Sequence, residues 1–268
     1  DLAIMTAFSF FLLPSVTVSS FLLSTDVILI FFWSLSLLSL IRLRKKPTNT
    51  NFLLLGIFLG ISFLAKYAAV YFFLSLILII IFDKKIRFIF FKNFFSTLLF
   101  VFTFISIILP NIFWNVKNDW VTISHTSDNA GLSRAGFNIL QGLEFLLIQS
   151  IMLGPILFVG SLFFFKKILM SFETKFLLSF SLPIFFVVFL ESILVRANAN
   201  WASVAIVSFF ILITASVYRH SKKILLLNNV FNVTICFVFF ILVLLSTPLS
   251  IFNRINGITS FTNQLRND

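Results

Sequence analysis

Nine long apolar runs, separated by short polar segments, constrain this chain more than any other feature of its sequence. They are residues 2–23, 27–41, 52–64, 68–82, 94–109, 143–165, 176–194, 201–217 and 230–247. The runs are continuously apolar and lack the period-two alternation of membrane strands, so they predict helices and not a barrel. With 60% hydrophobic and 11% charged residues, the chain is expected to be all-α: a polytopic transmembrane helix bundle with about nine membrane segments.

Basic residues gather in every second connection between these runs. Fourteen of the 20 Lys and Arg residues lie in four clusters, at 42–46, 84–92, 166–175 and 219–223. The positive-inside rule makes these connections cytoplasmic, and the others then face outward. Since this topology accounts for the net charge of +11, we expect membrane lipid as a partner and no nucleic acid.

Lys66 interrupts a segment, residues 52–82, that is otherwise long enough to be drawn as one helix. A single crossing would place two basic clusters on opposite sides and leave Lys66 in mid-membrane, at a cost of about 2.5 to 3.5 kcal/mol. A short hairpin that turns at "AKYAA" avoids both problems, and Lys66 then lies near the outer surface. Snorkelling to the interface would explain the residue, and so would contact with a phosphate.

Asp26 is an acidic residue at the outer end of an apolar run, without a neighbouring Lys or Arg in the sequence. It follows Ser24 and Thr25, and all three are good helix-capping residues. Capping and a role in a site are both compatible with this position.

The stretch "ESILVRANANWAS" places Glu191, Arg196, Asn198, Asn200 and Trp201 between two apolar runs. One interpretation is a turn in which Asn200 caps the next helix and Trp201 anchors it in the interface. That interpretation does not explain a Glu and an Arg at a depth where burial is costly unless they pair or bind something.

Metal and thiol chemistry have little support in the sequence. Cys236 stands alone within an apolar run, and His125 and His220 fall on opposite faces of the predicted topology. No metal ligands are therefore predicted, no cofactor is certain, and a requirement for a divalent ion is left open.

Five stretches in order carry a resemblance to a known family: "FFLLPSVTVSSFLLSTDVILIFFW", "LLLGIFLGISFLAKYAAVYFFLSLILII", "ILPNIFWNVKNDWV", "LEFLLIQSIMLGPILF" and "RANANWASVAI". The chain resembles the bacterial polyprenyl-phosphate-dependent glycosyltransferases of the protein mannosyltransferase and aminoarabinose transferase superfamily. The branch of lipopolysaccharide-core galacturonosyltransferases is the most similar.

The resemblance implies a C-type glycosyltransferase fold, with residues 1–268 forming a single membrane domain. It implies a polyprenyl-phosphate sugar as donor and lipopolysaccharide, lipid A or another envelope glycolipid as acceptor, at the periplasmic face of the inner membrane. By comparison with the family, the chain is expected to lack its first helices, which carry the catalytic acid of the first outward loop, and part of its C-terminus. The chain alone could then be inactive.

The resemblance also suggests roles for individual residues. Asp26 matches the family's second outward acidic position and is the predicted catalytic residue. Lys66 matches the cation of an "LSKYTA"-like stretch, while Arg196, Asn200 and Trp201 are retained from an "RVEPNWPAPAY"-like stretch. These four are the predicted contacts to donor phosphate or sugar. Asn198 stands where the family commonly has Glu.

The predicted function is therefore glycosyl transfer by a membrane enzyme. The alternative from another class is a transporter or lipid-carrier flippase, which would favour broken helices and polar groups near the midplane. Because the candidate polar residues collect at one face, we favour the enzyme.

Overall fold

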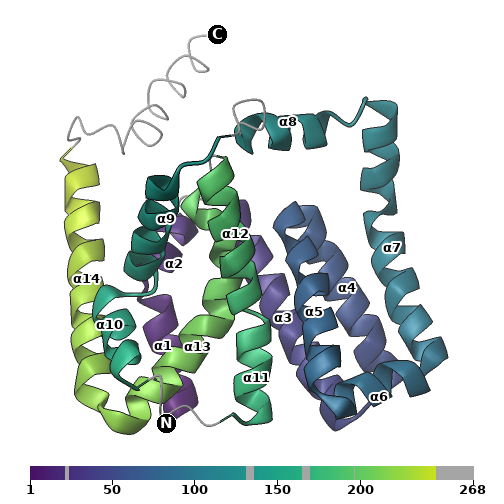
Figure 1. Ribbon diagram of the computed structural model, residues 1–268, viewed down its shortest axis with the longest axis horizontal. Helices are drawn as coiled ribbons and strands as arrows, with labels where there is room; N and C mark the ends of the chain where they lie inside the picture. The colour runs from purple at the N-terminus through teal and green to yellow at the C-terminus, as the bar shows by residue number, and fades with distance from the viewer. Residues whose placement is uncertain (22–23, 131–135, 165–169, 196, 246–268) are drawn as a thin grey trace.

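The computed structural model describes residues 1–21, 24–130, 136–164, 170–195 and 197–245, and in these the chain is helical, without a strand (Figure 1). In chain order the elements are α1 (Leu2–Phe11), α2 (Pro14–Phe21), α3 (Thr25–Lys45), α4 (Asn49–Ala65), the 3-10 helix η1 (Tyr67–Val70), α5 (Tyr71–Phe82), α6 (Lys84–Lys92), α7 (Phe94–Lys117), α8 (Val121–Ala130), α9 (Ile139–Met152), α10 (Pro155–Phe164), α11 (Phe172–Ser179), α12 (Leu182–Leu194), the 3-10 helix η4 (Ala199–Ala202), α13 (Ser203–His220) and α14 (Lys222–Leu244).

The predicted helical membrane bundle is confirmed, but the predicted count of about nine spans is not. Within the described ranges, five helical stretches are long and apolar enough to cross a membrane, and two bent pairs, α1 with α2 and α9 with α10, raise the number to at most seven. The runs at 52–64 and 68–82 form shorter helices. The 17 residues of α4 rise about 26 Å, which is less than the roughly 30 Å of a bilayer's hydrocarbon core.

Two helices lie across the bundle, one at each end. In Figure 1, α6 crosses the lower end and α8 crosses the upper end, while the long helices run between them. The α13–α14 turn and the basic helix α6 share the lower end, whereas η1 and η4 lie toward the upper end. The chain therefore separates its basic connections from the polar residues of the predicted site.

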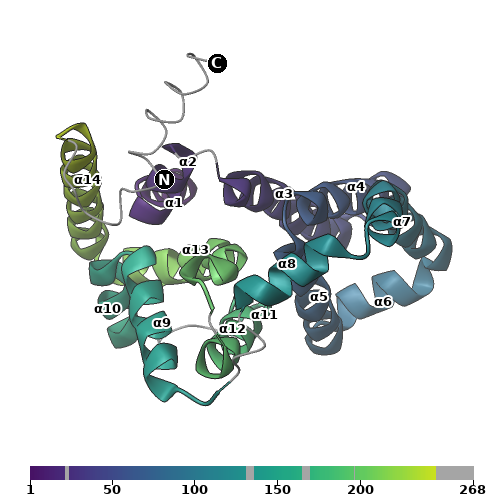
Figure 2. The ribbon, with the colours of Figure 1, turned by 90° about the horizontal axis from the view of Figure 1, so that it is seen from above.

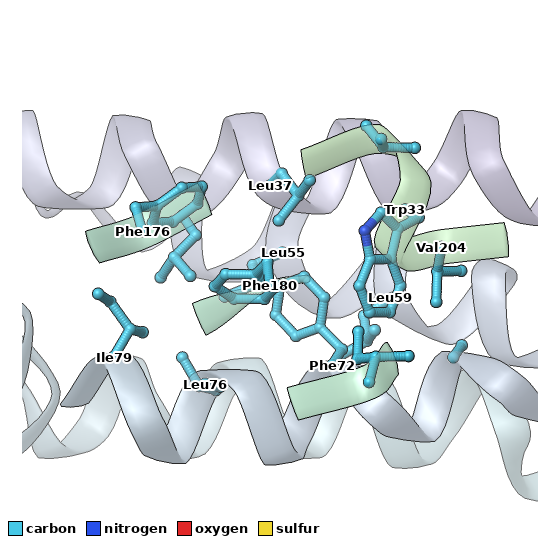
Figure 3. Close-up of a cluster of buried hydrophobic side chains, with 14 of the residues drawn as sticks. Trp33, Leu37, Leu55, Leu59, Phe72, Leu76, Ile79, Phe176, Phe180 and Val204 are labelled. Carbon is cyan, nitrogen blue, oxygen red and sulfur yellow. The ribbon is translucent and has the colours of Figure 1, made fainter. Parts of the chain in front are cut away.

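The helices pack through large aromatic rings. Trp33 of α3, Phe72 of α5 and Phe180, which follows α11, are fully buried, with ring centroids 4.9 to 6.2 Å apart (Figure 3). Without a hydrophobic driving force between helices in lipid, such close packing is a main source of their association. This cluster holds α3 and α5 together below the predicted site.

The break between α9 and α10 has a local cause. Gly154 adopts a φ of +88°, and an added Cβ would lie 2.6 Å from the amide of Asn228. The Asn228 Oδ1 accepts a hydrogen bond from the Leu157 backbone N at 2.9 Å, which satisfies one of the free N–H groups at the start of α10. The two helices meet at 98°.

The long outward connection begins later than the sequence indicated. The run predicted to end near residue 109 continues through Pro110, so that α7 ends only at Lys117. Asp119 and Trp120 then adopt positive φ angles of 50° and 55° and turn the chain into α8. The predicted interfacial helix in this segment corresponds to α8, which passes over the space between α7 and α12 (Figure 2).

An ion pair joins the elements at the end that carries α6. The Arg44 Nη2 lies 3.1 Å from the Asp83 Oδ2, and the Arg44 guanidinium stacks 3.6 Å above the Phe172 ring. Asp83 also caps α6 by accepting a hydrogen bond from the Ile86 N at 2.7 Å. Burial raises the pKa of Asp83, but the hydrogen bonds from Arg44 and the Ile86 N outweigh it, so the pKa is lowered below its ordinary value.

The variant Asp83→Asn is expected to be less stable than the original chain by about 1 kcal/mol at neutral pH. Asn retains the cap, so the difference reports the ion pair. Because the folded-state pKa of Asp83 is depressed, its contribution is present above the unfolded pKa, about 4, and is lost as the pH falls through the lower folded value. Thermal unfolding in detergent should show the two proteins converging at acidic pH, and a difference that persists there contradicts this origin.

Candidate active site

Asp26 and Lys66 meet at the end of the bundle opposite α6. Asp26 lies in the first turn of α3, where the positive helix terminus stabilises an anion, and Lys66 is the C-terminal cap of α4, where a cation is favoured. Their side chains form an ion pair with 2.7 Å between Lys66 Nζ and Asp26 Oδ1. The Asp26 side chain is 8% exposed and that of Lys66 is 23% exposed, so the pair is largely withdrawn from water.

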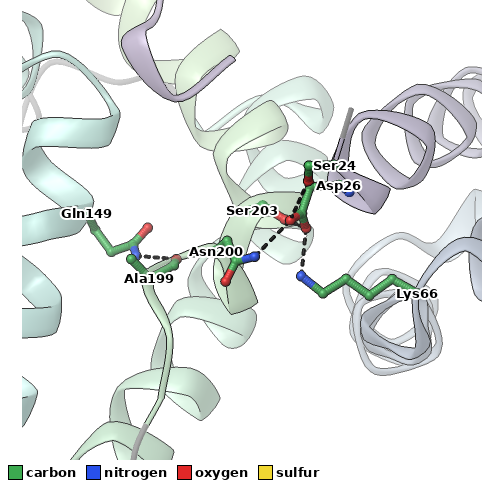
Figure 4. Close-up of polar contacts among 7 residues, drawn as sticks. All are labelled: Ser24, Asp26, Lys66, Gln149, Ala199, Asn200 and Ser203. Atoms are coloured by element: carbon green, nitrogen blue, oxygen red, sulfur yellow. Dashed lines mark hydrogen bonds and ion pairs between the residues drawn. The ribbon is translucent and has the colours of Figure 1, made fainter. Parts of the chain in front are cut away.

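The Asp26 carboxylate accepts four side-chain hydrogen bonds. Lys66 and Ser203 donate to Oδ1, at 2.7 and 3.2 Å, and Asn200 and Ser24 donate to Oδ2, at 2.8 and 3.1 Å. Figure 4 shows Asn200 and Lys66 approaching the carboxylate from different helices. Two carboxylate oxygens offer about four acceptor positions, and all four are occupied.

The capping alternatives are resolved differently for the two sites. Ser24, not Asp26, is the N-cap of α3, and its Oγ accepts a hydrogen bond from the Asp26 backbone N at 3.0 Å. The interpretation of Asn200 as a helix cap is wrong. Its amide lies within η4 and donates to Asp26 because the 3-10 turn aims it at α3 and away from the start of α13.

The backbone of η4 is held from its other side by α9. Gln149 is buried, and its Nε2 donates to the Ala199 carbonyl at 2.8 Å (Figure 4). This contact fixes the short segment that carries Asn200 and Trp201. A pair of predicted donor-binding residues thus depends on a buried amide of a distant helix.

A cavity of about 770 Å³ opens beside the ion pair. Lys66 and Trp201 line it, whereas Asp26 does not. The structure therefore brings Asp26, Lys66 and Asn200 together and places Trp201 at the adjoining wall. Arg196, the remaining predicted contact, lies outside the described residues.

A polar cluster fastens α8 over this cavity. The Tyr67 hydroxyl donates to Asn111 Oδ1 at 2.9 Å and lies 3.1 Å from Thr122 Oγ1, and Thr122 donates to Asn115 Oδ1. The Asn115 Nδ2 in turn donates to Tyr67 at 3.3 Å. Because the cluster joins η1, the end of α7 and the start of α8, it sets the height of α8 above the cavity.

Glu191 and Tyr71 form a second wall of the cavity. The Tyr71 hydroxyl donates to both carboxylate oxygens of Glu191, at 3.3 and 3.4 Å. Sequence reasoning noticed Glu191 but assigned it no role, and it missed Tyr67 and Tyr71. The signals available were the two tyrosines that follow Lys66 within one helical turn or so, and the four-residue spacing of Asn111 and Asn115.

No metal site is evident in the described part of the chain. Those residues include no group of three or more His, Cys, Asp or Glu side chains that could hold a metal ion. His125 lines the cavity, but its neighbours there are hydroxyls, amides, aromatic rings and apolar groups. The chemistry that the arrangement supports is charge stabilisation by Lys66 and hydrogen bonding by Asn200 at the mouth of a largely apolar cavity.

Comparison with known proteins agrees with the resemblance found in the motifs. Residues 1–114 match the family of dolichyl-phosphate-mannose-protein mannosyltransferases. The chain is 31% identical, over 234 residues, to the lipid A galacturonosyltransferase RgtD of Rhizobium johnstonii; the match covers 85% of this chain and 48% of that protein. The chain thus spans about half the length of the curated relative it matches. No solved structure matches it significantly.

Proposed function

We propose that this chain, which is similar to these membrane glycosyltransferases, forms the membrane part of an enzyme that moves a sugar from a polyprenyl phosphate to lipid A or another envelope glycolipid. The reaction takes place at the periplasmic face of the inner membrane. The observation that carries the proposal is the meeting of Asp26, Lys66 and Asn200 at a cavity of about 770 Å³. The similarity to a lipid A galacturonosyltransferase supports the acceptor.

Lys66 is the proposed contact to the donor phosphate. Its ammonium has three N–H donors, of which Asp26 takes one, and the residue lines the cavity. As the acceptor hydroxyl attacks the anomeric carbon, the bond from that carbon to the phosphate oxygen breaks and negative charge grows on the departing phosphate. A fixed cation at that oxygen stabilises the transition state more than the ground state.

Asp26 serves in this proposal as a positioning residue for Lys66 and Asn200. A carboxylate with four hydrogen bonds and little exposure has no free oxygen to receive the proton of an acceptor hydroxyl. The proton then passes to a different base. This assignment narrows the catalytic role that the sequence predicted for Asp26, and the kinetic experiment described in the Discussion separates the two.

The prenyl chain has an apolar route into the cavity. Leu64 and Val70 line the cavity beside Lys66, and their side chains are 44% and 50% exposed. In a bilayer these exposed groups face lipid. A polyprenyl tail can therefore remain among the acyl chains while its phosphate reaches the Lys66 ammonium.

The full-length protein in membranes is expected to transfer radiolabelled sugar from a polyprenyl-phosphate donor to lipid A. Product is followed by extraction and chromatography, with membranes lacking the protein as the control. Labelled lipid A that depends on the protein supports the proposal. Complete absence of product with neutral, amino and acidic sugar donors contradicts it.

One feature favours the alternative of a transporter. The break between α9 and α10 resembles the discontinuous helices of transporters, and it lies beside the buried amide of Asn228. However, Asn228 caps the broken helix through the Leu157 N, and the described charged residues of the site lie at one end of the bundle. Substrate uptake into proteoliposomes without any glycosylated product would favour transport.

A further inference from the structure

The carboxylate of Glu191 faces the cavity without an ionic partner among the described residues. It lies near the end of α12, half-buried, and it borders a neighbouring hollow of about 360 Å³ as well as the main cavity. The ion pairs of the described residues join Lys66 to Asp26 and Arg44 to Asp83, and neither involves Glu191. Its hydrogen bonds from Tyr71, at 3.3 and 3.4 Å, are long, so most of its acceptor capacity is unused.

The two charged walls of the cavity are therefore unequal. The charge of Lys66 is balanced by Asp26 at 2.7 Å, whereas the charge of Glu191 is balanced by no described side chain. A ligand with its phosphate at Lys66 would place the group attached to that phosphate inside the same cavity. That group meets a carboxylate in a partly dehydrated space.

Aromatic rings complete this wall. Tyr67, Tyr71 and Trp201 line the cavity together with Glu191. Rings offer flat apolar surfaces to the C–H faces of a pyranose, and a carboxylate accepts hydrogen bonds from two neighbouring hydroxyls. Binding sites commonly combine such apolar surfaces with a few polar groups that fix the orientation of the ligand.

We propose that Glu191, with Tyr71 as its hydrogen-bond donor, forms a sugar subsite that selects neutral or amino sugars and rejects uronic acids. Hydroxyl or ammonium groups supply the donors that the carboxylate lacks, whereas the carboxylate of a uronic acid meets a like charge. The inference rests on the proposed function and names the class of sugar that is carried.

The subsite is tested by binding, independently of transfer. Purified full chain in detergent is titrated with glucose 1-phosphate, glucosamine 1-phosphate and glucuronic acid 1-phosphate, and tryptophan fluorescence or thermal stabilisation reports affinity. The uronic acid is expected to bind at least about tenfold more weakly than the neutral sugar. In Glu191→Gln this ratio should fall to about threefold or less, and the amino sugar should lose more affinity than the neutral one if its ammonium pairs with Glu191.

Two further variants keep the result interpretable. Glu173→Gln makes the same chemical change at an exposed position in α11 and should leave the ratio unaltered. Tyr71→Phe removes the hydroxyl that donates to Glu191 while keeping the carboxylate, so discrimination against the uronic acid should persist or increase. It provides the test if Glu191→Gln does not fold.

The outcomes separate this inference from the proposed function. Equal or tighter binding of the uronic acid, or a ratio that Glu191→Gln does not change, overturns the subsite. Selectivity that depends on Glu191, without transfer from any prenyl-phosphate donor, supports the subsite and rejects the proposed function. Transfer that is fastest with a uronic acid donor supports the function and overturns the subsite.

Discussion

The variant Lys66→Met is expected to lower sugar transfer by about two to three orders of magnitude, because it removes the cation that stabilises the departing phosphate. It also leaves the Asp26 carboxylate, 6% exposed, without its ionic partner. Loss of one member of a buried pair costs about 3 kcal/mol. Transfer is measured under initial-rate conditions at several donor concentrations, and stability by thermal unfolding in detergent. Lys85→Met, an exposed lysine on α6, is the matched control and should change neither quantity.

The double variant Asp26→Asn with Lys66→Met separates stability from chemistry. Removal of both charges should recover most of the stability that Lys66→Met loses, since no unpaired buried charge remains. Transfer should not recover, because the phosphate contact is still absent. Transfer that returns together with stability would mean that the pair is only structural.

Asp26→Asn alone distinguishes a positioning residue from a catalytic base. If Asp26 orients Lys66 and Asn200, its loss should raise the KM for the donor, and the double variant should be little slower than Lys66→Met. A catalytic base would instead lower kcat at saturating donor while leaving KM similar, and its effect would multiply that of Lys66. The second pattern would restore the role predicted from the sequence.

Gly56→Ala is expected to destabilise the protein by about 2 kcal/mol. An added Cβ would lie 2.7 Å from the Phe100 carbonyl oxygen and 2.9 Å from the Thr103 Cβ, so α4 and α7 would have to move apart. Helix propensity alone predicts the opposite sign, because Ala is favoured over Gly by about 1 kcal/mol inside a helix. The measured sign therefore decides whether the close approach of these helices is real.

Gly136→Ala is the control for this prediction, because an added Cβ there has no neighbour within 4 Å. Its thermal unfolding should match that of the original chain. The displacement of α4 in Gly56→Ala would also shift Lys66, which caps this helix, so transfer should fall with stability. A stabilised Gly56→Ala variant with full activity contradicts the packing described for α4 and α7.

The sequence determined the helices and the two ends of the bundle, because both follow from local composition. Continuous apolar runs leave the helix as the way to satisfy backbone polar groups in lipid, and the spacing of basic clusters predicted which connections share a side. The turn at Lys66 was also predictable, since burial of a lone cation in mid-membrane is costly. The number of spans was not predictable, because some apolar runs form helices too short to cross and others are bent.

The tertiary structure alone decided which polar residues form the site. Asn200 and Asp26 are 174 residues apart, and their contact depends on how α13 packs beside α3. The same packing turns Asn200 away from the capping role that its position suggested and places Glu191 opposite Tyr71, 120 residues earlier. Residue type and spacing specify what a side chain can bind, but the relative rotation and height of packed helices, which many weak contacts determine together, decide what it meets.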